Sequence, residues 1–227
     1  MKNLIMTTNV SKKNDDPSPR SYSYHRELYE FAVERGRMLA DRVGADYHEI
    51  TDNSALSGWG PQWQRLSQFT SDIFKQYDYV MHHDADFIWS LDAPNPFELA
   101  EGNDLCAVPD LEENARRKRF KEIMNKTLKV DKPCLKHYKY FNSGLYITSR
   151  NFREQVTDMP DIIHKVRGHK WHDQDAINAA VVMYLDGNYK DLPRDFNYMF
   201  EGEKPSTIYG WHYGARYKSK FKKENHA

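Results

Sequence analysis

The fold of this chain is decided by Tyr77-Asp-Tyr-Val-Met-His-His-Asp-Ala-Asp-Phe-Ile-Trp89, an apolar run that leads into the acidic pair Asp84 and Asp86. The run predicts a buried strand, and side chains alternate along a strand, so both carboxylates point the same way from its carboxyl end. Ligands bind at this end of the strands in open α/β sheets. Two carboxylates aimed at one spot favour a hard cation such as Mg2+ or Mn2+, which typically also binds phosphates. The segment therefore predicts a metal–diphosphate site.

Composition limits the alternatives. The chain has 227 residues, enough for one substantial core, and equal numbers of basic and acidic residues, 33 of each. The net charge is therefore zero, and no long-range electrostatic field attracts nucleic acid or an anionic membrane. Neither is expected as a partner. Cys106 and Cys134 stand far apart without a metal-binding or disulfide pattern, which suits a reducing compartment. No stretch is long and apolar enough for a membrane span. We expect a cytoplasmic protein.

The order of the predicted elements indicates the fold class. Strands alternate with helices, which predicts a single-domain α/β/α sandwich over residues 1–227 with a mostly parallel central sheet. Residues 218–227 are expected to form a basic, flexible tail. The predicted strands lie near residues 4–6, 47–50, 77–84, 104–109, 141–148 and 207–212, and the predicted helices at 24–43, 62–76, 115–121, 151–168 and 173–185.

Four further segments follow the acidic pair in a fixed order. They are Tyr140-Phe-Asn-Ser-Gly144, Trp171-His-Asp-Gln-Asp-Ala-Ile-Asn178, Leu192-Pro-Arg-Asp-Phe-Asn197 and Trp211-His-Tyr-Gly-Ala-Arg-Tyr-Lys218. Together with Asp84-Ala-Asp86, the set resembles the GT-A-fold (Rossmann-like) nucleotide-sugar glycosyltransferases. The closest likeness is to family 8, the glycogenin and lipopolysaccharide galactosyltransferase type, and it runs from the first strand to Lys218. One such element arises easily by chance, whereas five in the right order do not.

The resemblance implies a metal site. It makes Asp84, Asp86 and His212 the ligands of Mn2+ (or Mg2+), with Ala85 beside the donor and Lys218 as a point charge on its diphosphate. The family's glycine falls three residues after the histidine, whereas Gly214 falls two after His212, so the register of this loop departs from the pattern. A histidine paired with a backbone carbonyl and a solvated lysine remain the alternatives for His212 and Lys218.

The resemblance also implies a donor-sugar site built from two turns. Asn142, Ser143 and Gly144 would allow a hexose to approach the backbone, although a turn at the start of a strand explains the same residues. Asp173 would bind sugar hydroxyls, and Gln174 would lie below the anomeric carbon. A capped helix start is the alternative for Asp173 and Asp175, which the resemblance places beside the donor.

Contacts with the nucleotide are assigned to two further places. Thr7, Thr8 and Asn9 follow the first strand and would face the base and ribose in this fold. Arg65 resembles a basic residue that family members place on the helix before the acidic pair, and a surface ion pair is its alternative. The basic patch at residues 116–119 lies where family members contact the acceptor, and a solvated helix face explains it equally well.

The favoured hypothesis is a metal-dependent hexosyltransferase that moves a sugar from a nucleoside diphosphate, UDP by preference, to a hydroxyl of a glycan or other acceptor, with retention. A glutamine amide is a poor nucleophile, which favours same-face attack by the acceptor over double displacement through Gln174. The blood-group type of retaining transferase ranks second. A haloacid-dehalogenase-like phosphatase and a non-catalytic sugar-binding module are the alternatives from other classes. The phosphatase pattern requires Thr or Val at the position of Ile88 and an acidic pair near the start of the chain.

Overall fold

The computed structural model describes residues 1–10, 25–110, 113–169, 172–200, 203–214 and 217–222. Its centre is a six-stranded sheet in the order β2-β1-β3-β6-β5-β7. Five of the strands run in one direction, and β6 is antiparallel to both of its neighbours. The α/β class and the mostly parallel sheet are therefore confirmed. The strands are β1 (Asn3–Thr8), β2 (Asp46–Ile50), β3 (Tyr79–Asp84), β5 (Leu105–Pro109), β6 (Phe141–Ser149) and β7 (Lys190–Asp191).

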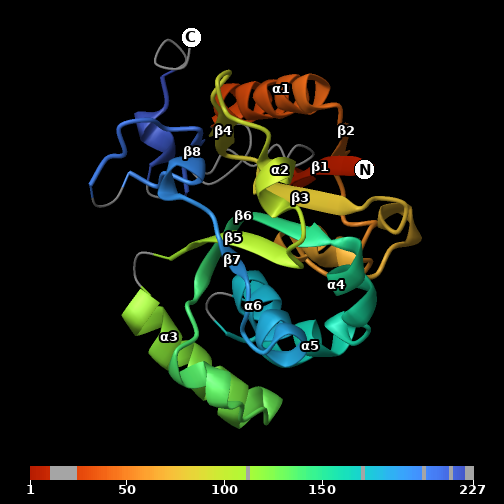
Figure 1. Ribbon diagram of the computed structural model, residues 1–227. Coiled ribbons are helices and arrows are strands. Elements are labelled where there is room, and N and C mark those ends of the chain that lie inside the picture. Colours follow the sequence, from red (N-terminus) through yellow and green to blue (C-terminus); the bar gives the residue numbers. More distant parts are fainter. Residues whose placement is uncertain (11–24, 111–112, 170–171, 201–202, 215–216, 223–227) are drawn as a thin grey trace.

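Helices cover both faces of the sheet. Figure 1 shows α1 (Arg26–Val43) on one side, and α5 (Met159–Val166) and α6 (His172–Leu185) on the other. The sheet separates two large apolar clusters. Met81, Phe87 and Trp89 belong to the cluster on the α1 side, and Tyr146 and Ile163 to the cluster beneath α5 and α6. Burial of these side chains, worth roughly 1.5–3 kcal/mol each, supplies the main driving force for the sandwich.

The first helix ends as its sequence predicts. Gly44 follows Val43 with φ of 67°, and its backbone N–H donates to carbonyls of the last turn. Only glycine adopts this left-handed conformation at low cost, so α1 stops here and the chain turns into β2.

The predicted helix at residues 62–76 is wrong in type. The structure has two 3-10 helices there, η3 (Pro61–Phe69) and η4 (Asp72–Phe74). The apolar residues Trp63, Leu66 and Phe69 are three apart, which matches the three residues per turn of a 3-10 helix and stacks their side chains on one face. All three pack in or against the cluster beneath α5 and α6.

The predicted helix at residues 151–168 is also wrong, because the chain forms two helices. These are α4 (Arg150–Gln155), capped by the Ser149 hydroxyl, and α5, which begins at Met159. Pro160 lies in the first turn of α5. Proline has no N–H to donate and its ring clashes with the carbonyl four residues earlier, so a continuous helix through this position is excluded.

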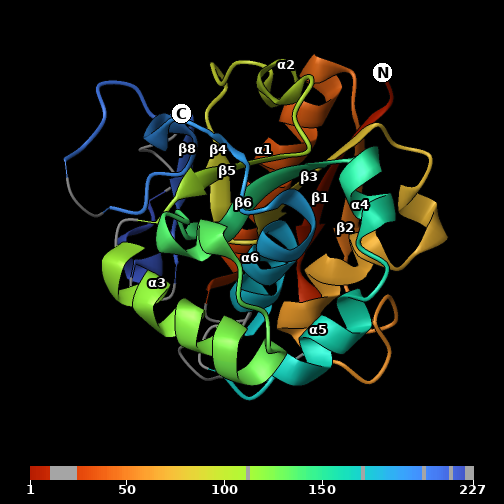
Figure 2. The same ribbon diagram turned by 60° about the horizontal axis from the view of Figure 1, so that its bottom comes forward.

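The strand predicted at residues 77–84 is present, and a second short strand, not predicted, follows the acidic pair. β3 ends at Asp84, residues 85–86 form a turn, and β4 (Phe87–Trp89) starts a separate two-stranded sheet with β8 (Gly210–His212). The pair is antiparallel, and Phe87 lies opposite His212. Figure 2 shows β4 and β8 side by side at one end of the main sheet.

Further short helices complete the described chain. α2 (Pro96–Ala100) is capped by Asn95, and α3 (Glu113–Glu122) continues into a π-helix, η5 (Ile123–Leu128). Three 3-10 turns follow: η6 (Pro133–Lys136), η7 (Arg194–Phe196) and η8 (Lys218–Lys220). None of the helices in the described ranges has the length and apolar character that a membrane crossing requires.

Candidate active site

Three candidate metal ligands meet at the end of β3. Asp84 closes the strand, Asp86 lies in the turn after it, and His212 ends β8. Nε2 of His212 lies 3.3 Å from Oδ2 of Asp84 and 3.5 Å from Oδ1 of Asp86. One ligand atom from each of the three lies within 4.8 Å of the others. Two carboxylate oxygens and an imidazole nitrogen at this spacing suit Mn2+ or Mg2+.

The two acids converge for a reason that strand alternation does not supply. The strand ends at Asp84, so Asp86 reaches the site from the turn centred on Ala85 and Asp86. The same turn starts β4, which pairs with β8 and brings His212 opposite Phe87. The turn therefore places all three side chains.

Basic groups balance the buried carboxylates. The pKa of Asp84 is held below its usual value, since Arg65 and His212 outweigh the effect of burial. Lys218 and His212 likewise lower the pKa of Asp86. Burial alone would lower the pKa of His212, but hydrogen bonds with both carboxylates raise it to about 9. The site thus keeps both carboxylates ionised at neutral pH, as metal ligands must be.

Lys218 belongs to this site. Its Nζ lies 3.0 Å from Oδ2 of Asp86 and donates to the hydroxyl of Tyr29 at 2.6 Å. The side chain is only 17% exposed, so the solvated alternative does not describe it. Lys218 and Lys220 form η8, while residues 223–227 of the expected tail lie outside the described residues.

Arg65 links the three candidate metal ligands to the predicted sugar site. Its guanidinium makes ion pairs with Asp84 at 2.7 Å and with Asp173 at 3.3 Å, and it donates to the carbonyl of Ser143 at 3.2 Å. Its side chain is 13% exposed. The surface ion pair considered for this arginine is therefore wrong, and the residue lies inside the site.

A chain of amide hydrogen bonds connects His212 to Gln174. Nδ1 of His212 lies 3.1 Å from Oδ1 of Asn197, and Nδ2 of Asn197 donates to Oδ1 of Asn142 at 3.3 Å. Nδ2 of Asn142 donates in turn to Oε1 of Gln174 at 3.4 Å, and the Ser143 N–H donates to the same oxygen at 3.2 Å. These residues are buried, so each amide has a fixed orientation.

Gly144 is required by close packing. A Cβ at this position would lie 2.1 Å from Cε1 of His212 and 2.8 Å from Oδ1 of Asn142, far inside contact distance. The Gly144 N–H donates to the same Asn142 oxygen at 2.8 Å. The glycine therefore serves the packing of His212 against the end of β6.

Asp173, Gln174 and Asp175 lie in the first turn of α6, which begins at His172, so Asp173 is inside the helix. Asp175 is completely buried and accepts from Arg119 and from the Tyr140 hydroxyl, each at 2.7 Å. Burial raises the pKa of Asp175 to about 6, although both hydrogen bonds act in the other direction.

Two residues near Gln174 are missing from the sequence prediction. Asp110 follows β5 and accepts from Nε2 of Gln174 at 3.4 Å, and it also pairs with Arg116. The sequence does contain a signal for Asp110, because it directly follows the strand predicted at residues 104–109 and ligands bind at the carboxyl ends of strands. Asn197 lies in the Leu-Pro-Arg-Asp-Phe-Asn motif, and only the fold places it against His212.

The predicted nucleotide residues lie at the carboxyl end of β1, where Thr7 and Thr8 close the strand and Asn9 follows it. Thr7 is buried and donates its hydroxyl to the carbonyl of His83 at 3.0 Å, and Asn9 donates to Glu49 at 3.0 Å. Thr8 lies opposite Asp84 in the register of β1 and β3. Asn9 also lines a cavity of about 290 Å3 against α1. The three residues are thus close to the acidic pair along the sheet.

Comparison with solved structures finds this architecture in glycosyltransferases. A glycosyltransferase involved in the glycosylation of the major capsid of PBCV-1 matches with a TM-score of 0.63 at 11% identity, over 97% of this chain and 98% of that one. The galactosyltransferase LgtC, in complex with donor and acceptor sugar analogs, matches with a TM-score of 0.56 at 14% identity, over 99% and 91%. The fold is that of a GT-A glycosyltransferase.

The GT-A fold also occurs within longer proteins. The bifunctional glycosyltransferase WbbM matches with a TM-score of 0.54 at 14% identity over 94% of this chain, which spans 46% of the length of WbbM. No known family profile matches the sequence, and no curated protein matches it. At these identities the likeness establishes the fold, and the activity of this GT-A chain has to be inferred from its site.

Proposed function

We propose that this protein is a metal-dependent glycosyltransferase that moves a hexose from a nucleoside-diphosphate sugar, UDP by preference, to a hydroxyl acceptor with retention. The observation that carries the proposal is the convergence of Asp84, Asp86 and His212 at the end of β3 in a GT-A fold. A mere sugar-binding module has no use for such a diphosphate clamp, and the phosphatase alternative places its acidic pair after the first strand rather than after β3.

The residues present fit a divalent cation. Asp84, Asp86 and His212 would hold it, and when bound it supplies positive charge that stabilises the departing nucleoside diphosphate. Lys218 contributes a further charge from the same side, because its Nζ already lies against Asp86. Arg65 keeps Asp84 and Asp173 in fixed positions, so that the metal ligand and the sugar-binding acid share one support.

Gln174 is proposed to lie below the anomeric carbon. Its Oε1 accepts from the Ser143 N–H and the Asn142 amide, so its orientation is fixed before a substrate arrives. A neutral amide dipole stabilises positive charge on the sugar in an oxocarbenium-like transition state without forming a covalent bond. We therefore propose attack of the acceptor from the same face as the departing diphosphate, whose oxygen takes the proton.

The test is a screen of nucleotide-sugars for Mn2+-dependent hydrolysis and transfer. One donor is expected to be turned over with Mn2+ and to be inert after chelation. Proton coupling constants of the transferred sugar read its anomeric configuration by NMR, and an inverted product would rule out retention. Release of phosphate from simple phosphomonoesters in place of sugar transfer would replace the proposal with a phosphatase activity.

A further inference from the structure

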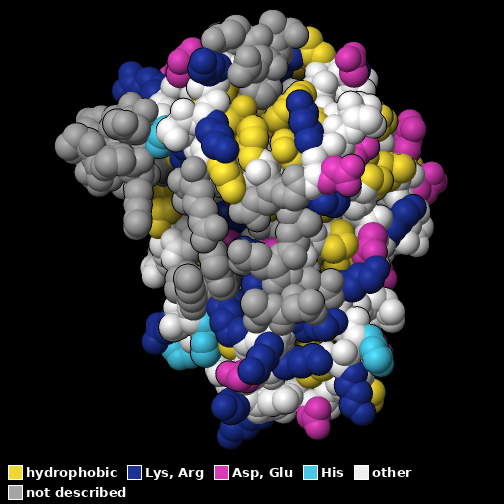
Figure 3. Space-filling model, turned by 90° about the vertical axis from the view of Figure 1, so that its left-hand side faces the viewer, with side chains coloured by type: hydrophobic (Ala, Val, Ile, Leu, Met, Phe, Trp, Pro, Cys, Tyr) yellow, Lys and Arg dark blue, Asp and Glu magenta, His cyan; other side chains and the backbone are white. Residues whose placement is uncertain are grey.

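Positive charge is concentrated in one stretch of this neutral chain. Residues 116–139 contain ten Lys or Arg and two Asp or Glu, although the whole chain has 33 of each kind. This stretch forms the larger part of α3, the π-helix after it and η6. Figure 3 shows Lys and Arg side chains gathered on the lower part of the face that carries α3. The excess therefore forms a surface, which we call the basic face.

Some of these charges serve the folded structure. Arg116 and Arg119 point inward and pair with Asp110 and Asp175. Others do not: Lys118, Lys126, Lys129 and Lys136 are exposed and have no ion pair within the described ranges. Clustered like charges without counter-charges are unfavourable unless a ligand or solvent ions compensate them.

The basic face is hollowed. A cavity of about 430 Å3 lies between α3 and η6, with Lys121, Lys132 and Lys136 and a single acid, Asp131, in its lining. Nζ of Lys121 donates to the carbonyl of Lys136 at 3.4 Å, which joins α3 to η6 beside the cavity. This is enough room for a sugar unit with an anionic group.

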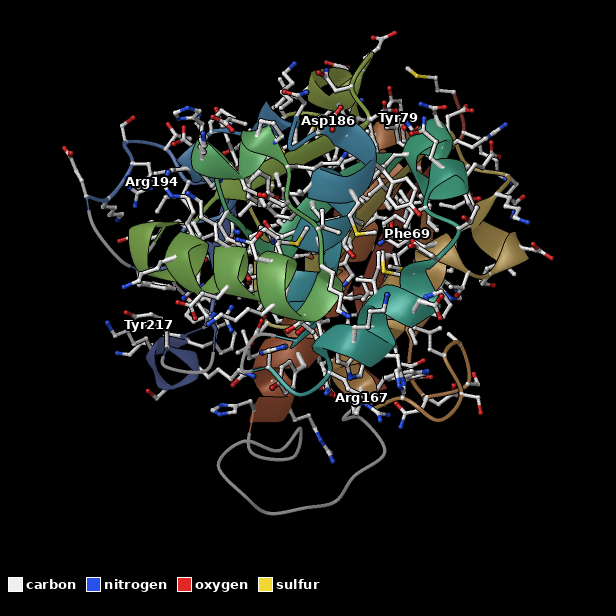
Figure 4. The ribbon with its side chains drawn as sticks, turned by 90° about the horizontal axis from the view of Figure 1, so that it is seen from below. Phe69, Tyr79, Arg167, Asp186, Arg194 and Tyr217 are labelled. Carbon is white, nitrogen blue, oxygen red and sulfur yellow. The ribbon has the colours of Figure 1, made fainter. Side chains whose placement is uncertain are left out.

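One helix connects this cavity with the proposed reaction centre. Arg119 binds Asp175, the neighbour of Gln174 in α6, and Lys132 of the cavity donates to the carbonyl of Met183, which lies nine residues after Gln174, about 14 Å further along the axis of α6. Figure 4 shows α3 crossing the front of the molecule in the view from below. An oligosaccharide with its end at Gln174 therefore has to span about 14 Å, a few sugar units, to reach the cavity.

We propose that the basic face binds the acceptor, and that this acceptor is a glycan carrying anionic groups such as carboxylates or phosphates. The inference rests on the proposed glycosyltransferase function and names the substrate class of the same site. Single-stranded nucleic acid is disfavoured, because stacking needs exposed aromatic rings and Phe120, Tyr138 and Tyr140 of this segment are all buried. A membrane surface is disfavoured too, since Ile123, Leu128 and Leu135 are buried and unavailable for insertion.

The experiment compares the wild type with the double variant Lys121→Gln/Lys136→Gln. The matched control is Lys190→Gln/Lys204→Gln, which removes two exposed lysines elsewhere. The ligands are a heparin-derived hexasaccharide as anionic glycan, maltohexaose as neutral glycan, a thymidine dodecanucleotide and phosphatidylserine vesicles. We expect the wild type and the control to bind the heparin hexasaccharide alike, and the double variant to bind it about tenfold more weakly, as loss of one half-buried and one exposed charge contact implies.

Three results would overturn the inference. They are equal binding of heparin hexasaccharide and maltohexaose, unchanged heparin affinity in the double variant, and tighter binding of the oligonucleotide or the vesicles than of the anionic glycan. Stabilisation of the same proteins by UDP with Mn2+ separates this inference from the function on which it rests. The double variant should be stabilised by UDP with Mn2+ as much as the wild type is. If UDP with Mn2+ fails to stabilise the wild type, that result counts against the proposed transferase and not against the basic face.

Discussion

At the scale of single residues, the site is an arrangement of buried charges that hold one another in place. Asp84, Asp86 and His212 each have small exposed areas, and Arg65 and Lys218 compensate the two carboxylates. Removing one partner from such a set leaves the others buried and unpaired, which costs more than the loss of an exposed pair. Substitutions that keep shape and remove charge are therefore the informative ones.

Asp86→Asn should abolish the Mn2+-dependent binding of nucleotide. The amide keeps the size of the side chain but loses the negative charge that a divalent ion needs. With UDP and Mn2+ at one hundred times Kd, the wild type should gain about 2.7 kcal/mol in free energy of unfolding, and the variant almost none. Thermal unfolding with each ligand alone and with both measures this. Asp92→Asn, in an exposed position, is the control; equal stabilisation of Asp86→Asn and wild type would remove Asp86 from the metal site.

Gln174→Ala should lower turnover while leaving nucleotide affinity nearly intact. The amide contacts Asn142, Ser143 and Asp110, and none of these is a candidate metal ligand. Loss of one oriented dipole at a reacting centre typically costs about a hundredfold in kcat. Single-turnover rates and titration with UDP and Mn2+ separate the two effects. A large loss of nucleotide affinity with unchanged kcat would place Gln174 with the nucleotide and not below the sugar.

At the scale of elements, His212 depends on η7 as well as on β8. Asn197 follows η7, and its Oδ1 accepts the only Nδ1 hydrogen bond of His212 that the described structure contains, which leaves Nε2 to face the carboxylates. A partner on the second ring nitrogen fixes the tautomer and the ring orientation of a metal-binding histidine.

Asn197→Ala should therefore weaken Mn2+ binding about ten- to a hundredfold, in line with other losses of such partners. Titration calorimetry with Mn2+ alone measures this without any activity assay. Asn188→Ala, an exposed asparagine after α6, should bind Mn2+ as the wild type does. If both variants bind the ion equally well, Asn197 has no part in positioning the histidine.

The sequence predicts elements well where side-chain spacing and breakers agree. Gly44 stops α1, the apolar run ends at Asp84, and the alternation of strands and helices indicates the correct fold class. The prediction is wrong at two helices, for different reasons. Pro160 divides the predicted helix at 151–168, and the three-residue spacing of Trp63, Leu66 and Phe69 suits a 3-10 helix rather than an α-helix. β4 and β8 are only three residues each, and their pairing depends on a contact between distant segments, which spacing does not encode.

The same distinction applies to the site. The order of the motifs is enough to assign Asp84, Asp86, His212 and Lys218 to one site. The structure shows that these four side chains lie close together. Arg65 and Asp110 differ, because their partners lie far away in the sequence. Arg65 reaches Asp84 and Asp173 from η3, and Asp110 reaches Gln174 from the end of β5, and the order of the motifs does not encode these contacts.

At the scale of the whole molecule, buried acids make stability depend on pH. The pKa of Asp175 is raised to about 6, above the ordinary aspartate value of about 3.9. Below pH about 4 Asp175 is protonated in both the folded and the unfolded state, and titration of this group takes nothing from the free energy of unfolding. Between these values the folded protein keeps a proton that the unfolded chain has released, so stability falls as pH rises, by about 3 kcal/mol in all.

Asp175→Asn removes this titration. The free energy of unfolding of the variant, relative to the wild type, should therefore rise by about 3 kcal/mol between pH 4 and pH 7. Urea unfolding at a series of pH values measures the difference. Asp161→Asn, an exposed position in α5, should follow the wild type throughout. Parallel curves for Asp175→Asn and wild type would mean that the pKa of Asp175 is the same in the folded protein as in the unfolded chain.

The pairing of β4 with β8 has a consequence for biosynthesis. Asp84 and Asp86 leave the ribosome well before His212, which follows Asp86 by 126 residues (212 − 86) and joins the acids only through the pairing of β4 with β8. A nascent chain that extends past β7 contains all six strands of the central sheet and still lacks one of the three candidate metal ligands. The candidate metal site is therefore complete only after β8 has been made, and a product that ends between β7 and β8 would contain the strands of the central sheet without His212.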